Sequence, residues 1–233
     1  MAIATTNTFN LNIGEIVEEA YERAGLQART GYDYRTARRS IDMMMLEWQN
    51  RGINLWTIES GTQTLTADTA TYTLPDDTID LMETHLRLDV GDSSSQTDYQ
   101  LTRISPTQYS DIPNKLQTGQ PTQIWIQRLT TTPQYTLWPV PDSTQTYTVA
   151  YYRIRQIYDS GTPGSNNMDV PKRFIPALVS GLAYYIAMKR PEVSERVGAL
   201  KQEYEFQFEL AAGEDTDTST ARFVPYQTFY MDS

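Results

Sequence analysis

The sequence predicts an α+β fold: a four-helix bundle with an inserted antiparallel β domain, either a barrel or a sandwich, and an extended C-terminal arm. Apolar residues recur at helical spacing near both ends of the chain and alternate with polar residues through its middle. The last segment joins an acidic stretch to clustered aromatic side chains. We therefore divide the 233 residues into an N-terminal helical hairpin (1–59), the β domain (60–170), a C-terminal helical hairpin that completes the bundle (171–213) and a docking arm (214–233).

The composition narrows the chemistry that the chain can perform. With 29 acidic against 19 basic residues and a net charge of −10, it lacks the positive balance with which proteins grip nucleic acid. The absence of cysteine excludes disulfides, thiolate metal sites and cysteine nucleophiles, and the one histidine is His85.

Two segments bear on targeting and membranes. Residues 1–12 contain no basic residue and no apolar core, so we do not expect a secretory signal. The longest mainly apolar stretch, residues 174–188, is shorter than the ~20 residues that cross a bilayer. We therefore expect no membrane partner and assign this stretch to a buried helix.

The first fifty residues predict two amphipathic helices. Apolar residues recur at helical spacing over residues 13–24, Asn12 and Glu15 have the spacing of a capping box, and Gly25 follows as a terminator. A second helix is expected over residues 33–51. Its apolar face consists of Tyr34, Ala37, Ile41, Met44, Met45 and Trp48.

From Ile53 onwards the pattern changes towards a period of two, which predicts β-strands. Turn-forming residues separate the strands, and residues 105–111 are expected to add one short helical turn. The expected strands cover residues 53–60, 62–68, 71–75, 81–90, 99–105, 122–129, 134–140 and 145–159.

Helical periodicity returns at Pro171. Residues 174–188 are apolar almost all round the helix, which predicts burial on several sides. A final helix is expected over residues 192–213, and Phe206 and Leu210 lie off its main apolar stripe. These two residues form either a contact surface for another subunit or a face that the β domain partly covers. The main stripe consists of Val193, Val197, Leu200, Tyr204 and Phe208.

The C-terminal segment combines a polar linker with an aromatic peptide. Residues 213–219 are acidic and polar, and apolar or aromatic side chains then dominate residues 223–230. The candidate anchors are Phe223, Val224, Tyr226, Phe229 and Tyr230. A linker that ends in such anchors is typical of a docking arm, and the alternative is a tail that folds back on its own β domain.

No arrangement of residues predicts a catalytic, cofactor or metal site. His85 shares one face of an expected strand with Glu83 and Arg87, opposite Met82 and Leu86, and we interpret it as a solvated strand residue. The sequence lacks the nucleophile turn of serine hydrolases and the ligand spacing of a calcium loop. It also lacks phosphate-binding, dinucleotide and zinc motifs. We expect a protein that is not an enzyme and takes no cofactor.

The order of these elements resembles a known family, the head-to-tail adaptors of short-tailed bacteriophages, known as tail tubular protein A-like gatekeepers. The resemblance covers about Asn12 to Gly213. Each piece is a weak signal alone, whereas their order around a β insertion is specific. The pieces are AYERAGL, RRSIDMMMLEWQNRGINLWTIE, LWPVPD, YTVAYYRIRQI and VPKRFIPALVSGLAYYIAMKRPE.

The resemblance implies a structural virion protein made in the host cytoplasm. Proteins of this family form a dodecameric ring under the portal at the capsid vertex, extend the DNA channel and carry the tail nozzle or tube. DNA would pass through such a ring without specific binding. The resemblance also implies that the arm reaches along the portal, with the aromatic residues of 223–230 as anchors.

Two hypotheses follow from the resemblance and the charge. The portal templates ring assembly by capturing many arms at once, because multivalency makes weak arm binding strong. Acidic residues line the channel, since residues 60–170 carry 12 acidic and 6 basic residues; the alternative is that this charge only keeps the protein soluble.

Two other function classes fit some residues. A tail-fibre or carbohydrate-binding module would stack sugars on Trp125 and Trp138, although such tryptophans more often lie in a core or a subunit contact. A cell-wall glycosidase would need two carboxylates placed across a substrate, and the close pair Asp76 and Asp77 is better explained as a turn.

Overall fold

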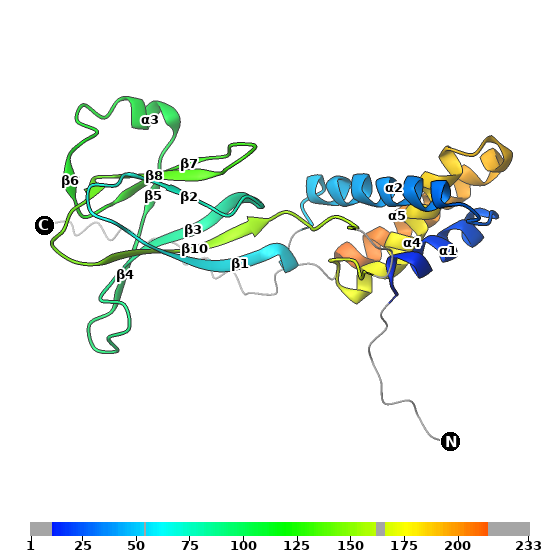
Figure 1. The fold of residues 1–233 in the computed structure, drawn as a ribbon, viewed down its shortest axis with the longest axis horizontal. Helices are drawn as coiled ribbons and strands as arrows, with labels where there is room; N and C mark the ends of the chain where they lie inside the picture. The colour runs from blue at the N-terminus through cyan, green and yellow to red at the C-terminus, as the bar shows by residue number, and fades with distance from the viewer. Residues whose placement is uncertain (1–10, 54, 162–165, 214–233) are drawn as a thin grey trace, which may run out of the picture.

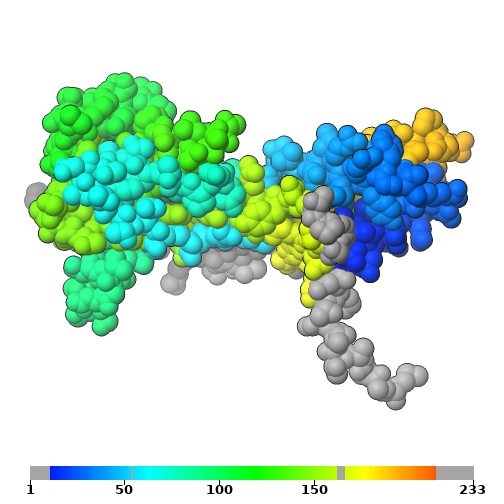
Figure 2. All heavy atoms as spheres, in the orientation of Figure 1, coloured from blue at the N-terminus to red at the C-terminus, as the bar shows by residue number. Residues whose placement is uncertain are grey.

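The structure is a computed structural model that describes residues 11–53, 55–161 and 166–213. The chain is α+β, with a helical body at one end of the long axis and a β body at the other (Figure 1). The helical body comprises α1, α2, α4 and α5, and the β body comprises the strands with α3. The space-filling view shows the two bodies as separate masses joined by a narrower middle (Figure 2).

The helices α1 (Ile13–Ala24) and α2 (Gly31–Asn50) both begin at capping boxes. The side chain of Asn12 accepts a hydrogen bond from the backbone N–H of Glu15 at 2.9 Å, and the Glu15 carboxylate accepts one from the N–H of Asn12 at 2.8 Å. Gly25 ends α1 in the left-handed region at φ 80°. Thr30 and Asp33 form the second box, so α2 begins two residues before the predicted start.

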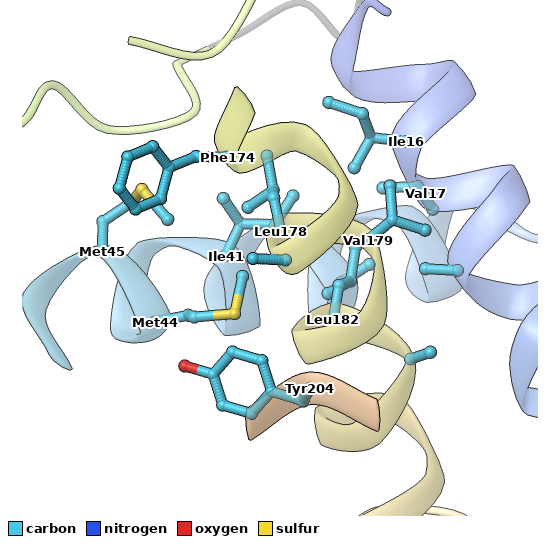
Figure 3. Packing of buried hydrophobic residues seen from close by; sticks show 14 of the residues in the cluster. Ile16, Val17, Ile41, Met44, Met45, Phe174, Leu178, Val179, Leu182 and Tyr204 are labelled. Carbon is cyan, nitrogen blue, oxygen red and sulfur yellow. The ribbon is translucent and has the colours of Figure 1, made fainter. Parts of the chain in front are cut away.

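The helix α4 (Ile175–Met188) lies at the centre of the helical body. It contacts α1, α2 and α5 (Val197–Gly213), and Figure 3 shows its apolar side chains among theirs. Residues on all of its sides are buried, as the all-round apolar pattern predicts. Gly181 allows the close approach of α5, because a Cβ there would lie 2.4 Å from Met44 Sδ and 2.8 Å from the Tyr204 ring.

The predicted last helix is split. The 3₁₀ helix η3 (Pro191–Arg196) precedes α5, because Val193 leaves helical geometry at φ −122° and ψ 21°. Of the predicted stripe, Tyr204 and Phe208 are buried, and Leu200 packs at the edge of the core.

The β body contains two four-stranded sheets. One has the order β1–β10–β3–β4 and is antiparallel throughout; the other has the order β2–β8–β7–β5, in which only the β5–β7 pair is parallel. β6 and β9 form a short parallel pair. The bounds are β1 (Ile58–Thr64), β2 (Thr71–Thr73), β3 (Thr78–Leu88), β4 (Thr97–Gln100), β5 (Thr102–Arg103), α3 (Pro106–Ser110), β6 (Thr118–Gly119), β7 (Gln123–Gln127), β8 (Gln134–Trp138), β9 (Val140–Pro141) and β10 (Tyr147–Arg155).

The two sheets share one hydrophobic core rather than closing into a barrel. Leu86 and Val149 from the first sheet join Ile124 and Tyr135 from the second in the same buried cluster. The chain crosses between the sheets at Leu101, which is buried between β4 and β5. Within the described residues both strand orders are open, so the barrel, one of the two predicted alternatives, is wrong.

The segment between α2 and β2 also differs from the prediction. Residues 53–68 form the 3₁₀ helix η1 (Leu55–Thr57) and a single strand, β1, instead of two strands. Gly61 is not a turn, because the strand passes through it and the missing side chain leaves room for the Tyr151 ring, which lies 2.6 Å from where a Cβ would be.

Candidate functional site

The predicted arm anchors lie outside the described residues. Phe223, Val224, Tyr226, Phe229 and Tyr230 all belong to residues 214–233. The site is therefore built from the faces that the described helices and strands present.

The outer face of α5 carries acidic and large apolar side chains. Phe206 is 55% exposed and Leu210 is 56% exposed, so the β body does not cover them. Glu203 and Glu209 are exposed beside them. We call these four residues the α5 stripe; it lies opposite the buried residues Tyr204 and Phe208.

The outer face of α2 carries basic and large apolar side chains, which the sequence analysis did not single out. Figure 2 shows α2, in blue, at the surface of the helical body. Tyr32, Met43 and Leu46 are 60%, 62% and 57% exposed, and Arg35 and Arg39 are exposed between them. We call these five residues the α2 stripe. Their spacing of three or four residues places them opposite the buried face of the helix.

A signal for the α2 stripe was present in the sequence. Met43, Met44 and Met45 are consecutive, and three successive residues of a helix span too wide an arc to face one core. In the structure Met44 and Met45 are buried and Met43 is exposed.

Three arginines of α2 make no ion pair with any residue that the structure describes. Within the described part of the chain, Arg35, Arg38 and Arg39 have no carboxylate within 4.0 Å. Together with Tyr32 and Asp42 they line a hollow of about 540 Å³. Nε of Arg38 is buried and has no hydrogen-bond partner there. Within the described residues this face therefore carries three arginines that make no close ion pair, with the one carboxylate of Asp42 in the lining of the same hollow.

An ionic cluster joins β10 to the segments that lead into the helical body. Arg155 donates from Nε to Glu59 Oε1 at 2.7 Å and from Nη1 to Asp169 Oδ2 at 2.5 Å. Arg153 donates from Nη2 to Glu59 Oε2 at 2.7 Å and from Nη1 to Asp77 Oδ1 at 2.5 Å. We call these five residues the junction cluster.

The arginines of the junction cluster change the titration of their partners. Hydrogen bonds from Arg155 and then Arg153 lower the pKa of Glu59 below its ordinary value. A hydrogen bond from Arg153 likewise lowers the pKa of Asp77. Both carboxylates are therefore charged at neutral pH, and their hydrogen bonds to the arginines are ionic. Asp169 is the member of the cluster that lies on the segment leading into α4.

Apolar contacts continue the junction into the helical core. The indole N–H of Trp56 donates to the backbone oxygen of Asp169 at 3.1 Å, and its ring lies 5.0 Å from that of Phe174. Ile157, which follows β10, is buried in the core of the helical body.

His85 lies on the outer face of the first sheet, partly exposed, beside a hollow of about 720 Å³. Arg87, which lines the same hollow, makes two 2.8 Å hydrogen bonds to Asp98. The prediction that Met82 shares a face with Leu86 is wrong. The register with β10 shifts between Glu83 and Leu81, and this bulge turns Met82 outward to 54% exposure.

The two tryptophans considered for sugar stacking make contacts within the chain. The ring of Trp125 stacks on that of Tyr109 at 4.8 Å. The indole N–H of Trp138 donates to the backbone oxygen of Asn114 at 3.0 Å. Neither contact favours a carbohydrate site.

The described residues were examined for metal-binding groups and for helices that could span a membrane. No group of three or more His, Cys, Asp and Glu side chains is placed to hold a metal ion. Among the helices that the structure describes, none has the length and apolar character needed to cross a membrane.

The chain was compared with models of protein families. The family model described as SU10 adaptor protein matches residues 11–226, which include both bodies. No curated protein matches the chain.

Proposed function

This chain belongs to the SU10 adaptor protein family, and from that premise we propose that it forms an adaptor ring joining the portal at the capsid vertex to the tail nozzle or tube. The family match carries the proposal, because it spans the helical body and the β body together. The ring is a dodecamer that extends the DNA channel of the virion. The chain acts by assembly and not by catalysis.

The surface of the helical body supports self-assembly. Large apolar side chains such as Met43, Leu46, Phe206 and Leu210 are more than half exposed. Exposed apolar side chains gathered on a helix face are typical of protein interfaces. A closed ring needs two different complementary faces on each subunit, and α2 and α5 each offer one.

The arm, residues 214–233, captures the portal in this proposal. Its aromatic residues are the anchors, and their burial offsets the cost of ordering the arm, about 1 to 2 kcal/mol per backbone residue. The portal collects many arms at once, so that weak single contacts add up to stable binding. The subunit is thus stable alone and closes into a ring on the portal.

The β body supports the passage of DNA without adhesion. Each of the five arginines within residues 60–170, namely Arg87, Arg103, Arg128, Arg153 and Arg155, has a carboxylate partner. The remaining basic residue, Lys115, donates to the backbone oxygens of Ser110 and Ile112. The basic side chains of residues 60–170 are therefore already bonded within the chain. The net negative surface lines the channel and repels the phosphates of DNA.

Native mass spectrometry tests the proposal. The chain is measured alone, mixed with the portal ring of the same virus, and as a variant that lacks residues 220–233. We expect a monomer alone, about twelve copies added to the portal, and no addition by a truncated variant that still folds. A full-length chain that ignores the portal contradicts the adaptor function, and portal binding by the truncated variant contradicts only the role of the arm.

A further inference from the structure

We infer that the α2 stripe of one copy of this chain packs against the α5 stripe of the next copy. The inference rests on the proposed function in taking the assembly to be a ring. The pairing of the two stripes comes from their charge, their apolar side chains and the direction of their helices.

Charge complementarity is the first argument. The α2 stripe holds Arg35 and Arg39 with Arg38 beside them, and within the described residues none of the three is paired with a carboxylate. The α5 stripe holds Glu203 and Glu209, which have no basic side chain within 4.0 Å in the same part of the chain. In a protein of net charge −10, a cluster of free arginines is the exception, and the opposite charge lies on the other stripe.

The order of side chains along each helix is the second argument. Three residues of each stripe follow the same order towards the C-terminus: Arg39, Met43 and Leu46 on α2, and Glu203, Phe206 and Leu210 on α5. Tyr32 and Arg35 precede the first set, and Glu209 lies between Phe206 and Leu210. From Arg39 to Leu46 is seven residues, as is Glu203 to Leu210, or roughly 10 Å along each helix. A parallel alignment therefore sets Arg39 opposite Glu203 and Leu46 opposite Leu210. Met43 and Phe206 then meet between these pairs.

The direction of the helices is the third argument. Late in α2, Trp48 contacts Phe174 at the start of α4, whereas Ser40 accepts a hydrogen bond from Lys189 just after α4 ends; α2 thus runs antiparallel to α4. α5 returns along α4 after the short η3 and brings Phe208 to Trp48. Hence α2 and α5 run in the same direction within one copy (Figure 1). Neighbours in a ring of about twelve differ by a rotation of roughly 30°, which preserves that direction.

The α2 stripe and the α5 stripe of one copy cannot contact each other. Each stripe lies on the side of its helix opposite the residues that face the shared core. The two faces are different, as a head-to-tail contact requires, and the same contact repeats around a ring.

Disulfide trapping tests the contact, because the chain has no cysteine of its own. The double variant Met43→Cys with Phe206→Cys is oxidised with and without the portal ring, and the products are separated without reductant. We expect a ladder of linked copies when the portal ring is present. The matched control pairs Phe206→Cys with Leu116→Cys, which is 84% exposed in the β body, and should give no ladder.

The copies bound to the portal, counted by native mass spectrometry, separate the two proposals. Portal binding with a ladder supports both. Portal binding without a ladder overturns the stripe contact and leaves the adaptor function standing. A ladder from a concentrated chain that does not bind the portal supports the contact and contradicts the function. Neither ladder nor binding overturns both.

A charge exchange gives an independent readout. Arg39→Glu and Glu203→Arg should each reduce the number of copies added to the portal at least tenfold, while the monomers stay folded. The double variant restores opposite charges at every contact and should recover most of the addition. Single variants that assemble like the unmodified chain, or a double variant that assembles no better than the singles, overturn the pairing of Arg39 with Glu203.

Discussion

The two bodies of this protein differ in whether their arginines form ion pairs. Each of the five arginines in the β body lies within 4.0 Å of a carboxylate of the same chain. In the described helical body, Arg35, Arg38 and Arg39 have no such partner. Within the described residues, the arginines of the β body are therefore neutralised by their own chain, whereas these three arginines of α2 are not.

The two bodies also differ in how the chain builds their cores. The helical core combines residues from both ends of the sequence, such as Trp48 and Tyr204, whose indole N–H and hydroxyl oxygen lie 2.9 Å apart. The β core combines residues of one continuous insertion. The buried clusters are separate, and the junction cluster, its apolar neighbours and a 2.9 Å hydrogen bond from the N–H of Ser160 to Asp42 connect the two bodies. Four predictions test this contrast, in order of decreasing effect on stability.

The largest effect is expected from Trp48→Ala in the helical core. Trp48 is fully buried, and its ring lies 5.3 Å from Phe174 and 5.7 Å from Phe208. Its removal should lower the free energy of unfolding by about 3 to 5 kcal/mol. Hydrogen exchange should quicken in α2, α4 and α5 and change little in β10.

Leu86→Ala in the β core is the matched control. Leu86 is fully buried. Its replacement should quicken hydrogen exchange in β3 and β10 and leave exchange in α4 nearly unchanged. If both variants quicken exchange equally in both bodies, the chain unfolds as one unit and the division into two bodies has no energetic meaning.

A smaller loss is expected from Arg155→Met in the junction cluster. The side chain of Arg155 is 8% exposed, and its removal leaves Glu59 with Arg153 as its one arginine and takes the arginine partner away from Asp169. We expect a loss of about 2 to 4 kcal/mol in urea unfolding, near the low end for a broken buried pair because Glu59 is 41% exposed. Arg128→Met is the control; its side chain is 60% exposed beside Asp80 and should cost less than about 1 kcal/mol. Equal losses would show that the junction is an ordinary surface contact.

Acid should loosen the junction through Asp77. Because its folded pKa is lowered by Arg153, its contribution is complete above the unfolded value of about 4 and is lost as the pH falls through the folded pKa. Asp77→Asn should therefore cost about 1 to 2 kcal/mol at pH 7 and flatten the decline of stability below about pH 4.

Urea titrations at pH 7, 4 and 2.5 measure this acid dependence. Asp76→Asn, at the exposed neighbouring position, should retain the acid dependence of the unmodified chain. If the stability of Asp77→Asn declines with acid as steeply as that of the unmodified chain, Asp77 does not cause the acid dependence.

The smallest effect on stability is expected when one arginine of each body is replaced by glutamine. Arg87→Gln removes a two-bond contact with Asp98 and should cost about 0.5 to 1 kcal/mol. Arg39→Gln removes no ionic contact among the described residues and should stay within about 0.5 kcal/mol of the unmodified chain. Thermal unfolding of the monomers measures both. A larger loss at Arg39 than at Arg87 would mean that the helical body does pair this arginine internally.

Much of the helical body could be predicted because its signals are local. Asn12, Glu15 and Gly25 specify the ends of α1 through contacts that span three or four residues. The burial of α4 follows from its composition alone. The β body was predicted less well, because pairing decides where a strand continues. Gly61 looks like a break in the sequence, yet Tyr151 of a distant strand needs its missing side chain. The outward turn of Met82 likewise depends on the register with β10.

The sequence by itself determined the α+β class, the caps of the first helix, the central buried helix and the resemblance to phage adaptors. These features depend on periodicity, on residues a few positions apart and on the order of elements. Only the tertiary structure decided that the sheets stay open, that Glu59 meets Arg155 across 96 positions and that Arg35 and Arg39 lack carboxylate partners within the described chain. The physical reason is that ionic and packing contacts depend on separation in space, which a linear pattern does not contain.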